Sequence, residues 1–276
     1  MMLFVSGLFS AYAATAPTLG TVKQFAVLAA STATNTGDTK VVGDLGVYPG
    51  STVTGFSPPG ESSGALHLAT AVAEQAQLDL TTAFNTLTQQ PCDFDLSGKD
   101  LGGLTLLPGV FCFSSSAQLT GELTLVGGAS DTFIFKIGTS LNIASASIVA
   151  GTPVCNVFWQ IGSSATLGTG SQLIGNIMAQ ASVTLNTDAK VYGRALARTG
   201  AVTMDTNLIV PFECSATPPD SSDDTPVPPV LPPGVPPPAP AEETFEIDAI
   251  GQVSSCEPTA QVVAVSTSVD GHLLPH

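Results

Sequence analysis

Apolar residues alternate with small hydroxyl residues through residues 163–209, and this alternation repeats along the chain. Three copies of one dipeptide pattern mark the repeat at steps of 18 and 19 residues: Thr166-Leu167, Thr184-Leu185 and Thr203-Met204. Alternation with a period of two predicts β-strands that turn apolar side chains to one face and hydroxyls to the other. A repeat of this length is too short to bury its own apolar face, so neighbouring copies must stack on one another. The pattern therefore predicts an all-β solenoid.

Further copies of the pattern occur earlier in the chain. Residues 21–56 combine short Val-rich segments with repeated glycines, as the turns of opening coils require. More coils are expected within residues 101–161, where Leu141 points inward and Asn142 outward. If corresponding strands pair in parallel, outward side chains lie about 4.8 Å apart between strands and about 6.6 Å apart along a strand. We expect the outward Ser and Thr side chains to form a rigid, uncharged grid, because β-branching restricts their rotamers.

Residues 62–90 break the alternation. Nine apolar residues recur there at spacings of three and four: Leu66, Ala69, Val72, Ala73, Ala76, Leu80, Ala83, Phe84 and Leu87. This spacing predicts an amphipathic helix. Ser62 or Ser63 can cap its start, and Pro91 ends it. We expect one long helix, at about residues 62–90, that lies along the solenoid and covers one apolar side.

Composition excludes several classes of partner. The chain has 276 residues, of which 11% are charged, and its formal net charge is −15. Nucleic acids and anionic membrane surfaces call for clustered Lys and Arg, whereas this chain has seven basic residues and none after Arg198. After the N-terminal region no apolar run is long enough to span a bilayer. We therefore expect a monomer that binds neither nucleic acid nor membrane and needs no cofactor.

Both ends of the chain differ from the solenoid. Residues 1–14 combine a short apolar run with Ala11-Tyr12-Ala13, which is typical of a secretory signal peptide and predicts a secreted, extracellular protein. Residues 215–241 are a Pro-rich linker, for which an extended conformation is expected. Residues 242–276 form an acidic tail that is too short for a core of its own. Disorder of this tail and attachment to another surface both stay open.

The five cysteines suit an oxidising compartment. They show neither a CxxC spacing nor a His pairing, so we expect no metal site. Cys92 and Cys112 bracket a loop-rich segment and are the first pair we expect to form a disulfide. Cys155 and Cys214 are the second expected pair, which leaves Cys256 without an assigned partner.

Several segments together resemble the DUF3494-type ice-binding, or antifreeze, proteins of cold-adapted microbes. They are FAVLAASTATNTGDTKVVGDLGVYPGSTVTGF, GKDLGGLTLLPGVFCFSSSAQLTGELTL, CNVFWQIGSSATLG and GRALARTGAVTM. The resemblance covers roughly residues 22–212, so residues 15–214 are predicted to be one ice-binding domain. It implies a right-handed, triangular and discontinuous parallel β-helix in which the first coils lie beside the last, with one helix alongside.

The resemblance also implies a flat face that adsorbs to ice, often described by a T-A/G-x-T/N motif. Five segments of this sequence match that motif loosely, with Ala or Gly at two of the first positions and Asn142 in place of a Thr. The residues that we expect to bind ice are Thr32, Thr34, Thr54, Ser140, Asn142, Ser164, Thr166, Ser182, Thr184, Ala201 and Thr203. Such a face would inhibit the growth and recrystallisation of ice, and the protein would not be an enzyme.

Two other classes of function stay open on the sequence. A polysaccharide-acting or carbohydrate-binding β-helix would use carboxylates on one wall, and Asp93, Asp95 and Asp100 crowd one loop. Acidic residues in a turn are more often simply solvated, and no catalytic Ser, His and Asp set can be assembled. A secreted cell-surface adhesin, with residues 215–241 as its stalk, is the second alternative.

Overall fold

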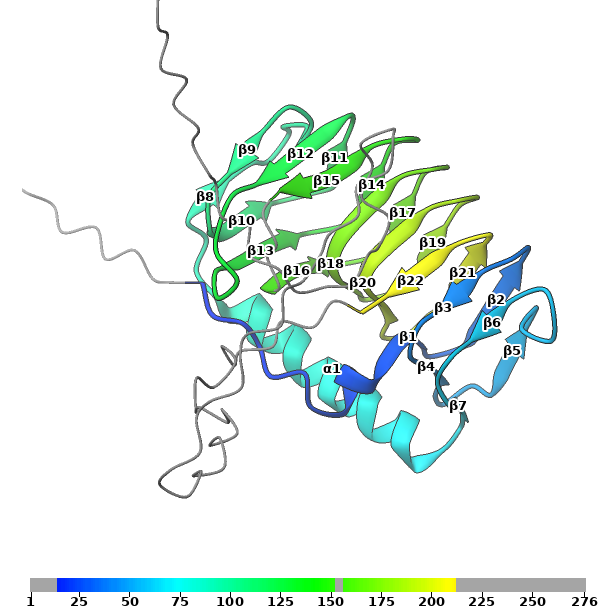
Figure 1. The fold of residues 1–276 in the computed structure, drawn as a ribbon. Coiled ribbons are helices and arrows are strands. Elements are labelled where there is room, and N and C mark those ends of the chain that lie inside the picture. Colours follow the sequence, from blue (N-terminus) through cyan, green and yellow to red (C-terminus); the bar gives the residue numbers. More distant parts are fainter. Residues whose placement is uncertain (1–13, 152–155, 212–276) are drawn as a thin grey trace, which may run out of the picture. The chain divides into compact units, whose positions relative to one another are not determined.

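The computed structural model describes residues 14–151 and 156–211 (Figure 1). In these residues every strand pairing is parallel, and the strands form one 15-stranded and one seven-stranded sheet. Neighbouring strands of each sheet come from neighbouring coils of the stack, and one long helix lies alongside (Figure 1). The predicted stacked, parallel β-solenoid with a single long helix is confirmed.

The coils present three rows of stacked strands. The first row, which we call the helix-covered face, lies beneath the helix. In spatial order its strands are β8 (Phe94–Asp95), β10 (Gly109–Phe113), β13 (Thr132–Ile137), β16 (Asn156–Ile161), the C-terminal halves of β18 (Gln172–Ala179) and β20 (Lys190–Ala197), β1 (Phe25–Ala29), β4 (Asp44–Val47) and β7 (Leu66–Leu68).

The second row, which we call the third face, belongs to the same sheet. Its strands are β9 (Thr105–Leu106), β12 (Glu122–Leu125), β15 (Ile148–Gly151), the N-terminal halves of β18 and β20, β22 (Leu208–Val210), β3 (Lys40–Val41) and β6 (Glu61–Ser62). The two rows join because β18 and β20 pass from one to the other at Gly175 and Gly193. These glycines are in register, and a Cβ at Gly193 would lie 1.9 Å from the Gly175 carbonyl oxygen.

The remaining row is the seven-stranded sheet, which we call the Thr face. Its strands are β11 (Ala117–Leu119), β14 (Leu141–Ile143), β17 (Ala165–Leu167), β19 (Val183–Leu185), β21 (Val202–Asp205), β2 (Thr32–Thr36) and β5 (Thr52–Thr54). Strands from residues 117–205 and strands from residues 32–54 therefore belong to one surface.

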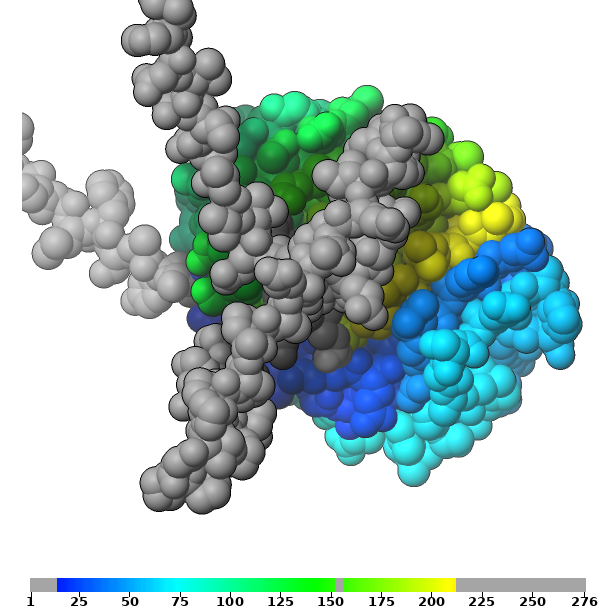
Figure 2. Space-filling model, in the orientation of Figure 1, coloured from blue at the N-terminus to red at the C-terminus, as the bar shows by residue number. Residues whose placement is uncertain are grey.

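The order of coils in space differs from their order in sequence. The first coil lies beside the last, because β1 pairs with β20, β2 with β21 and β3 with β22. Figure 2 shows the blue N-terminal coils directly against the yellow last coil. The buried Arg194 guanidinium also links them, donating to the Lys23 carbonyl at 2.8 Å and to Asn176 Oδ1 at 3.0 Å. This arrangement is the discontinuous one that the resemblance implied.

The helix α1 (Ala71–Gln89) connects the two ends of the stack, from β7 to β8 (Figure 1). It begins after Thr70, whose hydroxyl accepts the Ala73 N–H at 3.3 Å. The expected helix start at residue 62 is therefore wrong by nine residues. Residues 61–62 and 66–68 instead form β6 and β7, because backbone pairing with β3 and β4 overrides the helical spacing of the apolar side chains.

Two apolar layers hold these elements together. Inside the coils, aromatic rings stack in register along the helix-covered face, with centroids 5.2 Å apart for Phe111 and Phe135 and 3.9 Å apart for Phe135 and Trp159. Outside that face, Leu80 and Phe84 of α1 pack in one cluster with outward residues of the strands. The 3-10 helix η1 (Gly20–Gln24) lies against α1, and its Thr21 N–H donates to Asp79 Oδ2 at 2.7 Å. The helix is therefore an integral part of the core.

Several predictions concern residues outside the described part of the chain. The expected signal peptide, the Pro-rich linker and the acidic tail lie wholly or almost wholly there, as do Cys155, Cys214 and Cys256. The expected partners Cys92 and Cys112 are described, and they form a disulfide.

Candidate functional site

The Thr face carries a row of uncharged polar side chains, one from each of its seven strands. Strand register aligns Gln118, Asn142, Thr166, Thr184, Thr203, Thr34 and Thr54. Each of these side chains is exposed or half-buried, while the residues on either side of it point into the core or toward it. The alternation with a period of two places them outward. One surface thus presents five threonines, one asparagine and one glutamine in line.

A second row runs parallel to the first, two residues earlier in each strand. Its members are Ser116, Ser140, Ser164, Ser182, Ala201, Thr32 and Thr52. Backbone hydrogen bonds from the preceding coil fix this row: Ser164 O accepts from Leu141 N at 3.1 Å, and Ala201 O accepts from Val183 N at 2.9 Å. Neither row contains a charged side chain.

Two serine hydroxyls of the second row are themselves fixed by the backbone. Ser164 Oγ accepts the Ser182 N–H, and Ser182 Oγ accepts the Ala201 N–H, both at 3.3 Å. Each hydroxyl therefore has a preferred position, and its own hydrogen stays available to solvent. Immobile hydroxyls lose little conformational entropy when they bind a surface.

The layer beneath these rows is apolar and fully packed. Six of the seven residues between the two rows are buried, namely Ala117, Leu141, Ala165, Val183, Val202 and Ala33, and the seventh, Val53, is partly buried against the core. Beneath the other side of the first row, the buried Asn35 takes an apolar position and donates its amide to the carbonyls of Gly37 at 2.9 Å and Gly55 at 2.8 Å. Strands that pack in register on such a layer have little freedom to move.

All eleven residues that the sequence singled out lie in these two rows. The strand register adds three residues to the two rows that the sequence did not single out: Gln118, Ser116 and Thr52. Thr52 follows the same alternation as Thr54 and could have been included on that signal. Gln118 and Ser116 differ from the Ser and Thr pattern, so the pairing of β11 with β14 was needed to place them.

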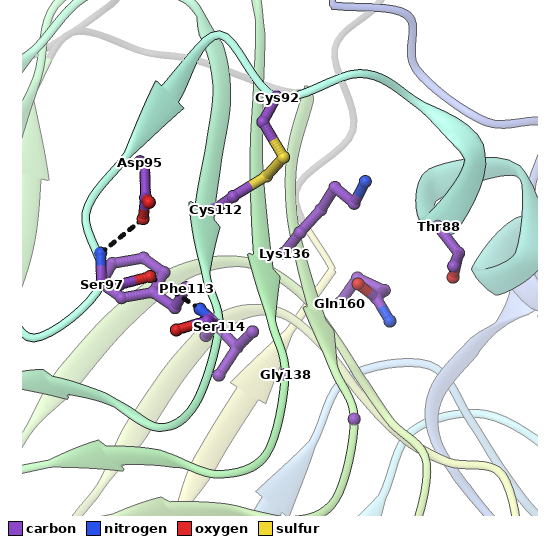
Figure 3. A pocket seen from close by; sticks show the side chains of 12 residues that line it. Thr88, Cys92, Asp95, Ser97, Cys112, Phe113, Ser114, Lys136, Gly138 and Gln160 are labelled. Atoms are coloured by element: carbon purple, nitrogen blue, oxygen red, sulfur yellow. Dashed lines mark hydrogen bonds between the residues drawn. A yellow bond between two sulfur atoms is a disulfide. The ribbon is translucent and has the colours of Figure 1, made fainter.

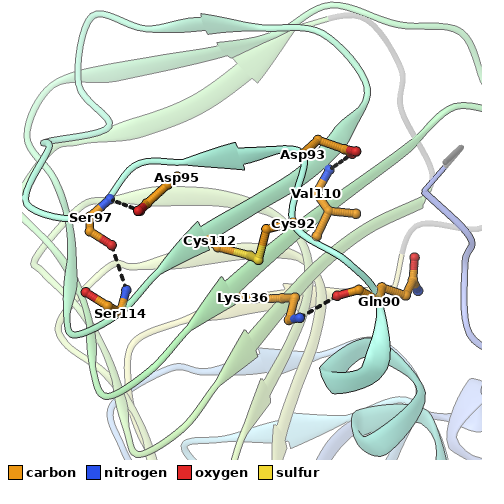
Figure 4. The surroundings of a disulfide bond; sticks show 9 residues. All are labelled: Gln90, Cys92, Asp93, Asp95, Ser97, Val110, Cys112, Ser114 and Lys136. Atoms are coloured by element: carbon orange, nitrogen blue, oxygen red, sulfur yellow. Dashed lines mark hydrogen bonds between the residues drawn. A yellow bond between two sulfur atoms is a disulfide. The ribbon is translucent and has the colours of Figure 1, made fainter. Parts of the chain in front are cut away.

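A cavity of about 490 Å³ lies elsewhere, between the C-terminal end of α1 and the neighbouring coils (Figure 3). Its polar groups are largely engaged within the protein. Lys136 Nζ donates to the Gln90 carbonyl at 2.6 Å, and burial lowers the pKa of this lysine. The Cys92–Cys112 disulfide lies in the wall, two residues after Gln90 (Figure 4). We interpret this region as the anchor of the helix's C-terminal end.

The acidic residues that crowd one loop each accept a hydrogen bond from the backbone. Asp93 accepts the Val110 N–H at 2.8 Å, and Asp95 accepts the Ser97 N–H at 2.9 Å (Figure 4). Asp100 Oδ1 accepts the N–H groups of Gly102 at 2.8 Å and Thr120 at 2.9 Å. Burial alone would raise the pKa of Asp100, but these hydrogen bonds lower it. Carboxylates used in this way stabilise turns.

Within residues 14–151 and 156–211, no three or more His, Cys, Asp or Glu side chains are grouped closely enough to hold a metal ion. The helices in the same ranges are all too short or too polar to cross a membrane.

Comparison with known proteins gives one consistent result. The family model described as "Ice-binding-like" matches residues 27–210. An ice-binding protein of Nostoc sp. (strain HG1) is 51% identical over 214 residues, which cover 76% of this chain and 79% of the relative. An ice-binding protein of Flammulina populicola is 33% identical over 242 residues, covering 78% of this chain and 98% of the relative.

Solved structures agree with the sequence relatives. The crystal structure of an ice-binding protein from an Antarctic biological consortium has a TM-score of 0.69 and 41% identity, covering 72% of this chain and 92% of that one. The crystal structure of the ice-binding protein of the Antarctic ascomycete Antarctomyces psychrotrophicus has a TM-score of 0.69 and 37% identity, covering 72% of this chain and 100% of that one.

Proposed function

Because the chain belongs to the ice-binding-like protein family, we propose that the Thr face is the surface with which it binds ice. The protein is an ice-binding, antifreeze protein. The proposal is that adsorption occurs through the two rows of the Thr face, and that bound protein inhibits the growth and recrystallisation of ice.

The alignment of the two uncharged rows is the observation that carries this proposal. Ice presents a regular lattice of water molecules with no net charge. A charged side chain would hold its own hydration shell and resist its replacement, whereas threonine offers a methyl group that orders water beside a hydroxyl that bonds to it. Repeated Thr and Ser side chains can therefore arrange surface waters in a pattern that merges with the lattice.

Rigidity makes many weak contacts effective. Each hydroxyl or methyl contributes little by itself, but the rows require almost no ordering on binding, since the backbone pairing and the apolar layer already fix them. Protein adsorbed in this way would curve the ice front between neighbouring molecules and stop its advance.

Substitution of one central threonine tests the face. Thr184→Tyr in the full-length protein places a bulky ring in the first row, and we expect it to remove most of the thermal hysteresis. Thr124→Tyr is the matched control, because Thr124 lies partly exposed on β12 of the third face. Equal hysteresis in both variants and the wild type would show that the Thr face is not the ice-binding surface.

We also propose that the protein acts outside the cell as a monomer. Its apolar N-terminal segment followed by Ala11-Tyr12-Ala13, and its disulfide between Cys92 and Cys112, support secretion. Fractionation of the culture followed by mass spectrometry of the protein in the medium tests this. Protein that retains Met1 and stays with the cells would contradict it.

A further inference from the structure

The Thr face is assembled from two parts of the chain that meet without a covalent connection. We call this boundary the seam, where β2 (Thr32–Thr36) pairs with β21 (Val202–Asp205). Thr34 is in register with Thr203 there, and Thr36 with Asp205. The seam therefore decides whether Thr34 and Thr54 continue the row that runs through Thr203 or form a separate, shorter array.

Asp205 lies at the end of β21 and presents a carboxylate beside the rows. Its Oδ2 accepts the Thr187 hydroxyl at 2.5 Å, and its Oδ1 accepts the Thr206 hydroxyl at 3.1 Å. Thr187 belongs to the preceding coil, 18 residues earlier. One oxygen of the carboxylate thus ties the last coil to the coil before it.

The seam lies on the other side of the same carboxylate. The hydrogen bond from Thr187 contributes most to lowering the pKa of Asp205; burial opposes this, and the hydroxyls of Thr206 and Thr36 lower the pKa further. Hydroxyls from three neighbouring coils therefore stabilise the ionised form. Of these, Thr36 belongs to the N-terminal part of the chain, across the seam, where it is the register partner of Asp205 and its hydroxyl donates to the Met204 carbonyl of β21 at 3.5 Å.

Backbone contacts around Asp205 leave little room for it to move. The Asp205 N–H donates to Asn207 Oδ1 at 2.6 Å, and the Asn207 N–H donates to Thr39 Oγ1 at 2.9 Å. Asn207 and Thr39 are both buried. Next to Thr36, Gly37 has a φ of +73°, and a Cβ there would lie 2.2 Å from Thr206 Oγ1. The carboxylate is therefore fixed at a point where the two chain segments pack closely together.

We propose that Asp205 is a positioning residue for ice binding, because its carboxylate keeps β2 in register with β21. In this role it makes Thr34 and Thr54 continuous with Thr184 and Thr203. The inference rests on the proposed role of the Thr face. It does not make Asp205 necessary for folding, since the pairings of β1 with β20 and β3 with β22, and the contacts of Arg194, also join the two parts.

A double-mutant cycle in the full-length protein tests the proposal. Thr34→Tyr and Thr166→Tyr are each made in the wild type and in Asp205→Ala, and thermal hysteresis is measured at equal protein concentration. Thr34 lies at the seam, whereas Thr166 lies two strands away from β21. Asp188→Asn is the control for loss of an exposed acidic residue at the neighbouring corner.

The expected result is specific to the seam. Asp205→Ala lowers thermal hysteresis several-fold, whereas Asp188→Asn leaves it unchanged. Thr34→Tyr causes a large loss in the wild type and little further loss in Asp205→Ala, while Thr166→Tyr causes a large loss in both backgrounds. A residue that mattered for stability alone would not separate the two threonines in this way.

Two results would overturn the positioning role of Asp205, and a third would overturn the role of the Thr face. If Thr34→Tyr costs the same fraction of hysteresis with and without Asp205, the positioning role is wrong. Unchanged hysteresis in Asp205→Ala would also overturn it. If Thr166→Tyr has no effect in the wild type, the Thr face itself is wrong. Should Asp205→Ala unfold, as judged by circular dichroism, Asp205→Asn replaces it in the same cycle, because the amide keeps one acceptor and loses the other.

Discussion

Thr34 and Thr203 place their hydroxyl oxygens 3.5 Å apart on neighbouring strands, although 169 residues separate them in the sequence. The contact joins β2, the second strand of the chain, to β21, which is the last strand of the Thr face in sequence order. Through this contact the first row of the Thr face continues from the repeats of residues 117–205 into Thr34 and Thr54.

The second row of the Thr face has one gap, at Ala201. This residue lies between Ser182 and Thr32 in the register and has no hydroxyl. Ala201→Thr adds a hydroxyl and a methyl at a partly exposed strand end, where β-branching is favourable. We expect higher thermal hysteresis and unchanged or slightly greater stability. Ala150→Thr, at a partly exposed position of the third face, is the control and should leave the hysteresis unchanged.

The disulfide between Cys92 and Cys112 closes a loop with a sequence separation of 20 residues. Its removal in Cys92→Ser/Cys112→Ser should lower the free energy of unfolding by about 3 kcal/mol, because the unfolded chain regains the entropy of an open loop. For a domain of this size, Tm should fall by roughly 10 °C. Thermal hysteresis should stay near the wild-type value, since the disulfide joins β10 to the end of α1, away from the Thr face. A Tm that does not change would contradict this account.

Left-handed residues stack at the corner between the Thr face and the third face. Ala146 (φ 57°), Gly170 (φ 66°) and Asp188 (φ 61°) occupy this corner in successive coils. A left-handed conformation is unfavourable for alanine and natural for glycine. Ala146→Gly should therefore raise the free energy of unfolding by about 0.5 kcal/mol, measured by urea denaturation. Ala144 lies two residues earlier and has no positive φ, so Ala144→Gly should lower the free energy of unfolding. A lower free energy of unfolding in both variants would refute the strain at Ala146.

Acid should destabilise the protein partly through Asp100. Burial by itself raises the pKa of Asp100, but hydrogen bonds from the N–H groups of Gly102 and Thr120 outweigh it, so the folded-state pKa is lowered. Its stabilising contribution is thus present above the unfolded pKa of about 4 and is lost as the pH falls through the lower folded-state value. In Asp100→Asn the free energy of unfolding should fall less steeply between pH 5 and pH 2. Curves of equal slope for the variant and the wild type would exclude this contribution.

The sequence by itself determined the repeating coils and the outward polar residues. Alternation with a period of two fixes which side chains can share a face, and a repeat of 18 or 19 residues must stack because it cannot bury its own apolar side. The alternation places Thr166, Thr184 and Thr203 in one row, and the segments that resemble the ice-binding family indicate the activity.

The tertiary structure decided how the rows continue and where the helix begins. Hydroxyl alternation in residues 32–54 is the same whether those coils lie beside β21 or at the other end of the stack, so only the pairing of β2 with β21 joins Thr34 to Thr203. Likewise, Leu66 fits a helical spacing but pairs as a strand with Leu45. Non-local backbone pairing of this kind leaves little trace in local sequence periodicity, because its energy comes from a neighbour that is distant in the chain.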